Sequence, residues 1–283
     1  MDQVSLSIEQ FRSLAAELRM DVLDMVHGAG TGHVDSSFSV IEVLVTLYFD
    51  VLRLDGKRPD WPDRDRVVLS KGHAAPALYA CLARRGYFDG SDLRSLRQLG
   101  SHLQGHPKVS TPGVDVPTGS LGQGLSLATG MAYAAWLEGR NDARWRVVAV
   151  LSDGELNEGQ TWEAIMLAGH LGLSNLTMVV DRNGLQYTGP TKEVLAIQGA
   201  PAAMEALGWS VRRADGHSYV SLRHELLHEA DRPVAILADT VKGKGVSFME
   251  HDLAWHGRAP TDAEYAAARE ELVAALNRAR GMA

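Results

Sequence analysis

Two short apolar segments in the middle of the chain are each followed by an oxygen-bearing side chain. Residues 147–151 have strand length and β-branched character, and Asp153 follows them; residues 176–180 are similar, and Asn183 follows. Ligands of open α/β sheets bind at the carboxyl ends of the strands, and neighbouring strands lie about 4.8 Å apart. We therefore expect Asp153 and Asn183 to reach the same ion.

The ion that suits these two side chains is Mg²⁺ together with a phosphate-bearing ligand. Mg²⁺ takes oxygen ligands at about 2.1 Å, and it completes its octahedron with water and substrate phosphates. Gly154 lets a phosphate approach the backbone closely. The pair therefore predicts a metal–diphosphate site. On spacing alone a second interpretation stays open, because Asp and Asn are also common N-cap and turn residues.

The elements that would position these residues form a strand–helix–strand unit. Residues 162–171 repeat apolar side chains with a period near 3.6, and Gly172 stands where a C-cap is expected. Such a unit places its two strands parallel and adjacent in one sheet. Residues 66–70, 209–213 and 233–239 are further strand candidates. This rhythm predicts an α/β fold: a doubly wound, mostly parallel sheet with helices on both faces.

Capping patterns locate the other main helices. Ser7 and Thr261 stand at the starts of the first and last helical patterns. Ser37 or Ser39 is expected to cap a strongly apolar helix that ends near Leu52. No linker or repeat divides the sequence, so we expect one domain over residues 1–283.

Several histidines lie beside glycines in segments that read as loops or strand ends. His33, His73 and His106 each follow a glycine, and His256 precedes one. The segment 100–124 around His106 contains three prolines and six glycines, and long loops in compact domains are usually functional. A glycine neighbour frees the backbone to bring an imidazole against a ligand. The alternative is that each is an ordinary surface histidine.

Composition excludes several classes of function. The chain has 283 residues, 45% of them hydrophobic and 22% charged, as in ordinary globular proteins. No stretch of about 20 apolar residues occurs, and the net charge of −7 argues against nucleic acid or anionic membrane as a partner. The first residues lack a signal-peptide pattern, and the single cysteine, Cys81, fits a reducing compartment. We expect a cytoplasmic protein in which Cys81 is a buried helix residue.

The order of the motifs resembles the transketolase family of thiamine diphosphate enzymes. The central unit resembles the thiamine diphosphate motif, with Asp153-Gly154, Glu158 five residues after the Asp, and Asn183 about thirty residues on. Further motifs in the family's order are Gly32-His33, Ser70-Lys71-Gly72-His73, Gly105-His106-Pro107, Thr118 to Gly124, Lys242-Gly243-Lys244-Gly245 and Trp255-His256-Gly257. The resemblance covers nearly the whole chain.

The resemblance implies a set of ligands for the cofactor. Asp153, Asn183 and the backbone carbonyl of Leu185 would hold Mg²⁺, or Ca²⁺ or Mn²⁺ in its place. The residues that would contact the diphosphate are Gly154, His73 and His256. Those that would contact the aminopyrimidine side are Gly119 and Leu121. Glu158 would lie at a dimer interface that links two cofactor sites.

The resemblance also implies the reaction. A two-carbon ketol unit would pass from a ketose or ketose phosphate to an aldose. The catalytic residues would be His33, His106 and His256, which would move protons and stabilise developing oxyanions. Unperturbed histidine pKa values of about 6.5 would suit that work near neutrality.

Two departures from the family pattern affect the predicted site. Val34-Asp35 stands where family members commonly have Pro-Gly, and Ser152 replaces the first glycine of a Gly-Asp-Gly triplet. Asp35 would put a carboxylate near the substrate mouth. It could bind an acceptor hydroxyl, repel an anionic acceptor, or serve only as a helix-start residue.

The chain stops after the first domain of a full-length transketolase. In the family, a glutamate on a second, pyrimidine-binding domain helps to form the reactive carbanion of the cofactor. We therefore expect this chain to be one subunit of a split enzyme, active only with a separate pyrimidine-domain subunit that also carries the C-terminal domain. The expected assembly is an α2β2 heterotetramer.

Other functions remain open on the sequence. The chain could belong to another thiamine diphosphate enzyme, such as a 2-oxo acid dehydrogenase or a deoxyxylulose-phosphate-synthase-like protein, or it could be a non-catalytic thiamine diphosphate-binding module. An unrelated nucleotide-binding α/β protein is a further alternative. The glycine pattern of residues 119–124 is not a dinucleotide fingerprint, because no strand precedes it. The sequence names neither the donor sugar nor the acceptor.

Overall fold

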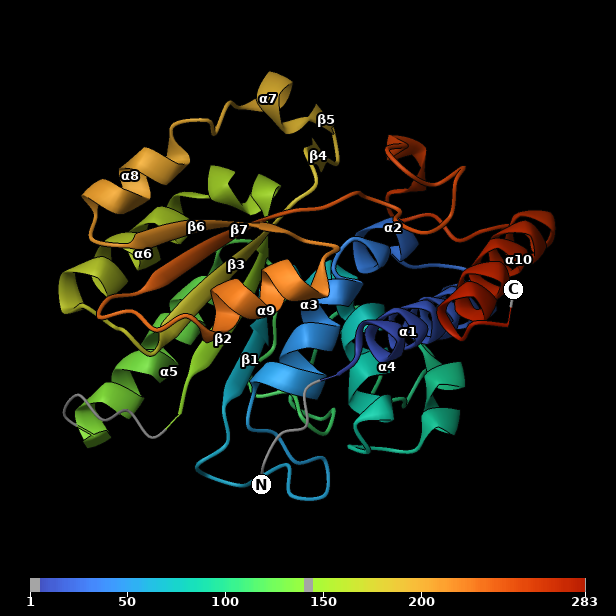
Figure 1. Cartoon of the computed structure of the whole chain (residues 1–283), viewed down its shortest axis with the longest axis horizontal. Coiled ribbons are helices and arrows are strands. Elements are labelled where there is room, and N and C mark those ends of the chain that lie inside the picture. Colours follow the sequence, from blue (N-terminus) through green and yellow to red (C-terminus); the bar gives the residue numbers. More distant parts are fainter. Residues whose placement is uncertain (1–5, 140–144, 283) are drawn as a thin grey trace.

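A five-stranded sheet, entirely parallel, forms the centre of the molecule (Figure 1). The computed structural model describes residues 6–139 and 145–282, so the first five residues, which enter the signal-peptide prediction, lie outside it. In spatial order the strands are β1 (Arg66–Leu69), β2 (Val147–Ser152), β3 (Leu176–Arg182), β7 (Val234–Asp239) and β6 (Ser210–Asp215). The predicted α/β fold and the predicted parallel pairing of the two central strands are confirmed.

The sheet separates two hydrophobic cores, because alternate side chains of a strand point to opposite faces. In β2, Val148 and Val150 pack into one core, whereas Ala149 and Leu151 pack into the other. Strands buried on both faces read as continuous apolar runs, which is why the segments found in the sequence show no alternation.

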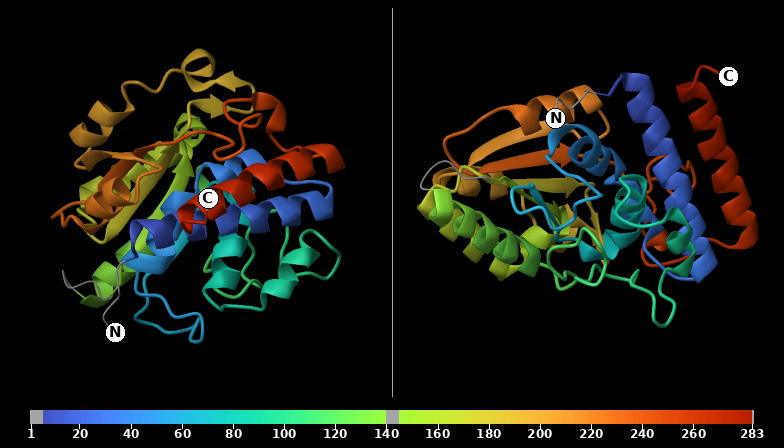
Figure 2. Two further views of the ribbon diagram at one scale, coloured as in Figure 1. Left: turned by 45° about the vertical axis from the view of Figure 1, so that its right-hand side comes forward. Right: turned by 90° about the horizontal axis from the view of Figure 1, so that it is seen from below.

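Helices cover both faces, and the two further views in Figure 2 show the same layers. Around the larger core lie α1 (Ile8–Ala29), α2 (Val34–Phe38), α3 (Ile41–Thr46), α4 (Ala75–Arg84), α9 (Tyr219–Leu227) and α10 (Asp262–Ala279). Around the smaller core lie α5 (Gln123–Gly139), α6 (Gly159–Leu171) and α8 (Ala200–Ala206). A short antiparallel hairpin, β4 (Leu185–Gln186) and β5 (Gly189–Pro190), leads into α7 (Thr191–Val194).

Local capping chemistry sets the helix ends that the sequence predicts. Ser7 and Thr261 each form a complete capping box, at the starts of α1 and α10. Gly172 ends α6 in the left-handed conformation with φ of 61°.

Cys81 is fully buried in α4, as expected, and burial raises the pKa of its thiol.

The apolar helix predicted to start at Ser37 or Ser39 begins later, at Ile41, and a separate short helix precedes it. Helix α2 starts at Val34, with His33 at its N-cap, and α3 follows before a π-helical turn at Leu47–Val51. Ser39 does not cap the start of α3, because its hydroxyl donates to Asp181 Oδ2 at 2.5 Å; it lies instead at the C-cap of α2. Ser39 therefore binds a residue at the carboxyl end of β3 instead of capping the start of a helix.

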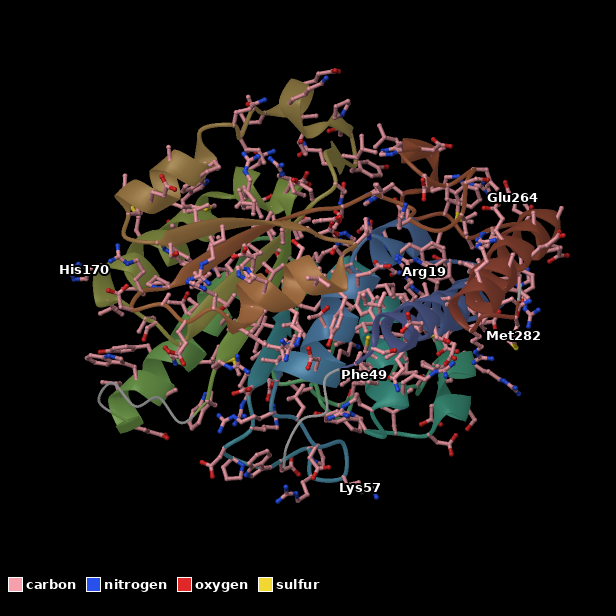
Figure 3. The ribbon with its side chains drawn as sticks, in the orientation of Figure 1. Arg19, Phe49, Lys57, His170, Glu264 and Met282 are labelled. Carbon is pink, nitrogen blue, oxygen red and sulfur yellow. The ribbon has the colours of Figure 1, made fainter. Side chains whose placement is uncertain are left out.

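Arg19 joins α1 to α3 by a buried ion pair and to the segment after β7 by a hydrogen bond. Arg19 points into the molecule, whereas Lys57 and His170 lie at its periphery (Figure 3). The Arg19 guanidinium binds Glu42 at 2.7 Å and donates to the carbonyl of Lys244 at 2.7 Å.

Among the helices within residues 6–139 and 145–282, none has the length and apolar character that crossing a bilayer requires.

Candidate active site

Asp153 and Asn183 lie together at the carboxyl edge of the sheet. Strands β2 and β3 pair in register up to the last residue of β2, so both side chains follow at the same edge. The Gly154 amide donates to Asp153 Oδ1 at 2.9 Å, and the Gly184 amide donates to Oδ2 at 2.7 Å. Both Asp153 and Asn183 are buried. The strand-end juxtaposition that the sequence predicts is therefore present.

The charge of Asp153 is poorly compensated by the protein alone. Burial, and then the neighbouring carboxylate of Asp181, raises the pKa of Asp153 to about 6. The Leu185 amide donates to Asn183 Oδ1 at 3.1 Å, which brings Leu185 beside the pair. Within the described residues, no group of three or more His, Cys, Asp or Glu side chains is arranged for a metal. A cation at Asp153 would therefore need oxygens from a ligand as well.

A cavity of about 510 Å³ opens beside this pair. It gathers side chains from the ends of β1, β2 and β3 and from three loops. Among its lining residues are His33, His73, His106, Gly119, Leu121, Gly154, Glu158, Asn183, Leu185 and His256. Every residue predicted for the site except Asp153 thus lines one cavity, although these residues come from segments far apart in the sequence.

Three of the predicted histidines form a cluster in the cavity wall. The ring centroids of His33 and His73 lie 5.2 Å apart, those of His33 and His256 4.9 Å, and those of His73 and His256 5.7 Å. His106 stands apart from this cluster and is exposed, packed against Gly119. The cavity therefore offers several imidazoles to a single ligand.

The pKa values of these histidines differ from the prediction of unperturbed values. Burial, and then the nearby His256, lowers the pKa of His33 to about 4. Burial and the Lys71 ammonium place the pKa of His73 well below its usual value, and burial also lowers the pKa of His106. These three imidazoles are therefore neutral at neutral pH. Each offers one N–H donor and one acceptor nitrogen rather than a positive charge.

Glycines let the loops around the cavity approach each other. At Gly72 an added Cβ would lie 2.8 Å from the backbone of Thr118 and Gly119, so no side chain fits there. Gly119 has a φ of 153°, and an added Cβ would lie 3.0 Å from the His106 ring. The Thr118 hydroxyl donates to the Leu69 carbonyl at 2.7 Å, which fixes the loop to the end of β1.

Two buried lysines were not assigned a role from the sequence, although both lie in motifs that it singles out. Lys71 pairs with Asp181, and Lys242 lies 3.2 Å from Asp35 Oδ2; all four residues are buried. Lys71 and Lys242 line the cavity. The only sequence signal was their position beside Gly72 and Gly243, because no local pattern reveals a buried ion pair.

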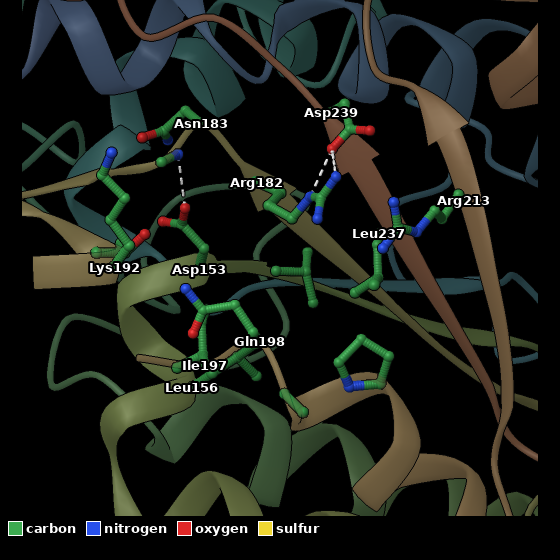
Figure 4. Close-up of a pocket in the computed structure, with 15 residues that line it drawn as sticks. Asp153, Leu156, Arg182, Asn183, Lys192, Ile197, Gln198, Arg213, Leu237 and Asp239 are labelled. Atoms are coloured by element: carbon green, nitrogen blue, oxygen red, sulfur yellow. Dashed lines mark hydrogen bonds and ion pairs between the residues drawn. The ribbon is translucent and has the colours of Figure 1, made fainter. Parts of the chain in front are cut away.

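A second cavity of about 360 Å³ is drawn in Figure 4. It shares Asn183 with the first cavity. Asp153 lines this second cavity, and so does the ion pair between Arg182 and Asp239. None of the four predicted histidines lines it. The four predicted imidazoles therefore belong to the first cavity.

Glu158 lies at the exposed rim of the first cavity. The adjacent buried acid is Glu155, which accepts from the Gly122 amide at 2.8 Å. Glu155 thus holds the loop at the start of α5, whereas Glu158 is accessible to a partner.

Known proteins resemble this chain over nearly its whole length. The family described as transketolase, thiamine diphosphate binding domain, matches residues 11–277. The 6-deoxy-6-sulfo-D-fructose transketolase subunit SqwG of a Clostridium species is 41% identical, over 90% of this chain and 93% of the relative. An apulose-4-phosphate transketolase subunit of Phocaeicola vulgatus is 34% identical, over 94% of this chain and 95% of the relative.

Full-length transketolases match over less than half of their own length. The human enzyme is 38% identical over 89% of this chain, which covers 40% of the human protein. The crystal structure of transketolase from Campylobacter jejuni superimposes with a TM-score of 0.89 at 31% identity; the match covers 97% of this chain and 46% of that one.

Proposed function

The chain belongs to the transketolase family, and we propose that it is the thiamine diphosphate-binding subunit of a split transketolase. Such an enzyme is a transferase that moves a two-carbon ketol unit from a ketose or ketose phosphate to an aldose. The observation that carries the proposal is the cavity at the carboxyl edge of the sheet, where a strand-end acid and amide lie beside four histidines.

The residues present fit thiamine diphosphate and a divalent cation. Two buried polar atoms of the cavity lining, His33 Nδ1 and Asn157 Oδ1, have no hydrogen-bond partner, as expected where a polar ligand binds. Asp153, Asn183 and the Leu185 carbonyl would hold Mg²⁺, or Ca²⁺ or Mn²⁺, because all three offer the oxygen atoms that these cations prefer. A cation would also offset the charge that burial disfavours on Asp153.

Other residues would hold the organic part of the cofactor. Those placed to contact the diphosphate are Gly154, His73 and His256, and those placed to contact the aminopyrimidine are Gly119 and Leu121. At Gly154 an added Cβ would lie 3.1 Å from the Gln186 side chain, so glycine keeps this part of the cavity open.

The histidines would handle protons and developing charge during ketol transfer. When bound, thiamine diphosphate supplies the carbanion that makes and breaks the carbon–carbon bond. His33 and His106 would be neutral, and each could donate one hydrogen bond to a sugar oxygen and accept one from a hydroxyl. His256 lines the same cavity and would donate to oxygens of the substrate or the diphosphate.

The rest of the enzyme would come from a partner. The two relatives that match over nearly their whole length are both named as subunits, which supports a separate partner carrying the pyrimidine and C-terminal domains. The 283 residues would then form one domain that binds the diphosphate and metal end. Exposed Glu158 at the cavity rim would lie at the interface that links two sites in an α2β2 assembly. The lone buried cysteine supports a cytoplasmic location.

Sugars or sugar phosphates are the proposed substrates. The two subunit relatives are named for different sugars, a sulfonated ketose and apulose 4-phosphate, so these names favour no single donor.

Calorimetric titration of the complex with thiamine diphosphate and Mg²⁺ tests the cofactor site. We expect Asp153→Ala and Asn183→Ala to abolish measurable binding. Asp239→Ala is the matched control, because Asp239 ends the neighbouring strand β7 at the same edge but its carboxylate pairs with Arg182. Full affinity in both site variants, with the fold intact, would contradict the proposal.

Activity of the complex tests the reaction. With the partner subunit present, we expect turnover of ketose phosphates with an aldose acceptor and none with pyruvate alone. The opposite preference would place the chain in another class of thiamine diphosphate enzyme.

A further inference from the structure

Asp35 lies behind the cavity wall, where a family member commonly has glycine. The residue is fully buried in the first turn of α2, and it does not line the cavity. Its Oδ1 accepts from the Ser36 amide at 2.6 Å. Its Oδ2 lies 3.2 Å from Lys242 Nζ and 3.6 Å from His256 Nδ1 but accepts no well-aligned hydrogen bond. Binding an acceptor hydroxyl, repelling an anionic acceptor or starting a helix would not require Asp35 to lie beside both Lys242 and His256.

The Lys242 ammonium is surrounded by three acceptors. Its Nζ lies 3.1 Å from Ser36 Oγ, 3.2 Å from His256 Nδ1 and 3.2 Å from Asp35 Oδ2. An ammonium has three protons and no lone pair, so it can only donate to these atoms. His256 Nδ1 must then accept, which leaves the ring proton of neutral His256 on Nε2, at the opposite side of the ring.

The donation from Lys242 to His256 depends on a negative charge close to the Lys242 ammonium. Lys242 is 2% exposed, and burying an ammonium without a counter-charge is strongly unfavourable. Within residues 6–139 and 145–282, Asp35 is the one carboxylate in ion-pair range of Lys242. Burial acts to raise the pKa of Asp35, but the pKa lies below its usual value, and the Lys242 ammonium contributes to this lowering. The Gly243 amide also donates to the Asp35 carbonyl at 3.0 Å, which fixes the lysine loop against α2.

We propose that Asp35 is a positioning residue: its carboxylate keeps Lys242 an ammonium, and Lys242 in turn fixes His256 as the tautomer that points an Nε2–H into the cavity. The Nε2–H of His256 would then bind an oxygen acceptor of the ligand, such as a diphosphate oxygen or a carbonyl or hydroxyl oxygen of a sugar. That consequence for catalysis rests on the proposed function, whereas the tautomer of His256 does not.

Nuclear magnetic resonance of the full chain tests the proposal directly. Long-range ¹H–¹⁵N spectra of ¹⁵N-histidine-labelled protein at alkaline pH distinguish the two neutral tautomers, and His256→Gln identifies the signal. We expect the wild-type chain to show Nε2–H at His256. In Asp35→Asn the unbalanced ammonium loses its proton and can accept from Nδ1–H, so the Nε2–H form should lose its predominance. Lys242→Met should have the same effect, because it removes the donor to Nδ1.

Matched variants separate this role from general damage to the fold. Asp50→Asn removes another buried carboxylate, one bound by Tyr219 and Arg223 away from the cavity, and should leave the His256 signal unchanged. If Asp35→Asn fails to fold, the double variant Asp35→Asn/Lys242→Met restores the charge balance and must still alter the tautomer. An Nδ1–H tautomer in the wild type, or an unchanged Nε2–H in Lys242→Met and in whichever Asp35 variant folds, would overturn the proposal.

Cofactor affinity gives the functional readout. In the complex with the partner subunit, Asp35→Asn should weaken thiamine diphosphate binding roughly tenfold, as expected when a buried hydrogen-bond partner is misplaced. Unchanged affinity would contradict the role of Asp35 in the site. If the wild-type complex bound no thiamine diphosphate while the tautomer responded as expected, the proposed function would fail and the role of Asp35 would stand.

Discussion

Two buried lysine–aspartate pairs flank Ser36, and they differ in how completely their atoms are bonded. In the first pair, Lys71 binds Asp181, and it also donates to the Ser36 carbonyl at 3.0 Å. Asp181 accepts further hydrogen bonds from Ser39 and Thr240. In the second pair, Asp35 Oδ2 has a cation nearby but no well-aligned donor, and the lysine shares its protons with His256 in the cavity wall.

The difference shows how the same chemistry can serve two purposes. The first pair is saturated, and its bonds join the end of β3, the segment after β7 and α2 next to Asn183. Buried pairs of this kind are costly to break, because the remaining charge is left uncompensated. The second pair retains bonding capacity and contacts a residue of the cavity. We infer that the Lys71–Asp181 pair maintains the shape of the site, whereas the Lys242–Asp35 pair determines which nitrogen of His256 carries the proton.

The largest expected effect comes from breaking the saturated pair. Asp181→Asn should lower the free energy of unfolding by about 3–5 kcal/mol, because Lys71 would remain buried without a counter-charge. Urea unfolding followed by circular dichroism measures the loss. Asp239→Asn is the control, since its exposed pair with Arg182 should contribute only about 0–1 kcal/mol. If Asp181→Asn were no more damaging than Asp35→Asn, the contrast between the pairs would disappear.

The second largest expected effect is on the pH dependence of the free energy of unfolding. It arises because the folded chain holds the His33 imidazole neutral. The folded chain keeps His33 neutral down to about pH 4, whereas the unfolded chain protonates it below about 6.5. The unfolded state therefore binds more protons between these values, and stability falls as the pH is lowered through this window. The contribution of His33 is up to about 3 kcal/mol, at about 1.4 kcal/mol per pKa unit.

Unfolding measured at several pH values tests this expectation. His33→Gln should flatten the acid dependence between about pH 6.5 and 4. The exposed His224 offers a matched variant, His224→Gln, which should leave the dependence unchanged. A pKa near 6.5 for His33 in the folded chain would show that the cavity does not exclude the charged imidazole.

Breaking the unsaturated pair should cost less stability than breaking the saturated one. We expect Asp35→Asn to lower the free energy of unfolding by about 1–3 kcal/mol. The asparagine oxygen can still accept from the Ser36 amide, and the neutral Lys242 amine expected in this variant can still donate to Ser36 Oγ. The same urea experiment measures the loss, and a double-mutant cycle with Lys242→Met gives the coupling. A coupling energy near zero would mean that the two charges act independently.

The smallest expected effects come from two neighbouring serines of α2 and its C-cap. Ser39→Ala removes a hydrogen bond to Asp181 and should cost about 1 kcal/mol. Ser37 is equally buried, but its hydroxyl has no partner, so Ser37→Ala should stay within about 0.5 kcal/mol of the wild type. Equal losses in the two variants would show that the saturated pair does not depend on Ser39.

Much of the fold could be predicted because its signals are local. The capping boxes at Ser7 and Thr261 and the left-handed Gly172 depend on residues within one turn of the chain. The apolar runs of β2 and β3 reveal strands because both faces of the sheet are covered. The start of α3 was predicted wrongly, because Ser39 bonds to Asp181, 142 residues away, instead of capping that helix.

The candidate site was predictable to a similar degree and for a similar reason. Asp153 and Asn183 follow from strand ends, and the four histidines from their glycine neighbours, so their residue types and positions were visible in the chain. The lowered pKa values of His33 and His73 were not visible, since they result from burial and from neighbours such as His256 and Lys71 that the fold brings near. Burial of Asp35 was equally hidden, although its departure from the family pattern was visible.

The sequence by itself determined the order of strands and helices, the acid and amide that end two central strands, and the family to which the chain belongs. These depend on side-chain periodicity and on short motifs, which act over a few residues. Only the tertiary structure decided which charges are paired, because Lys242 reaches Ser36 across 206 positions of the chain and Lys71 reaches Asp181 across 110. The strength of such pairs depends on exclusion of water, and water is excluded only when the whole chain has folded.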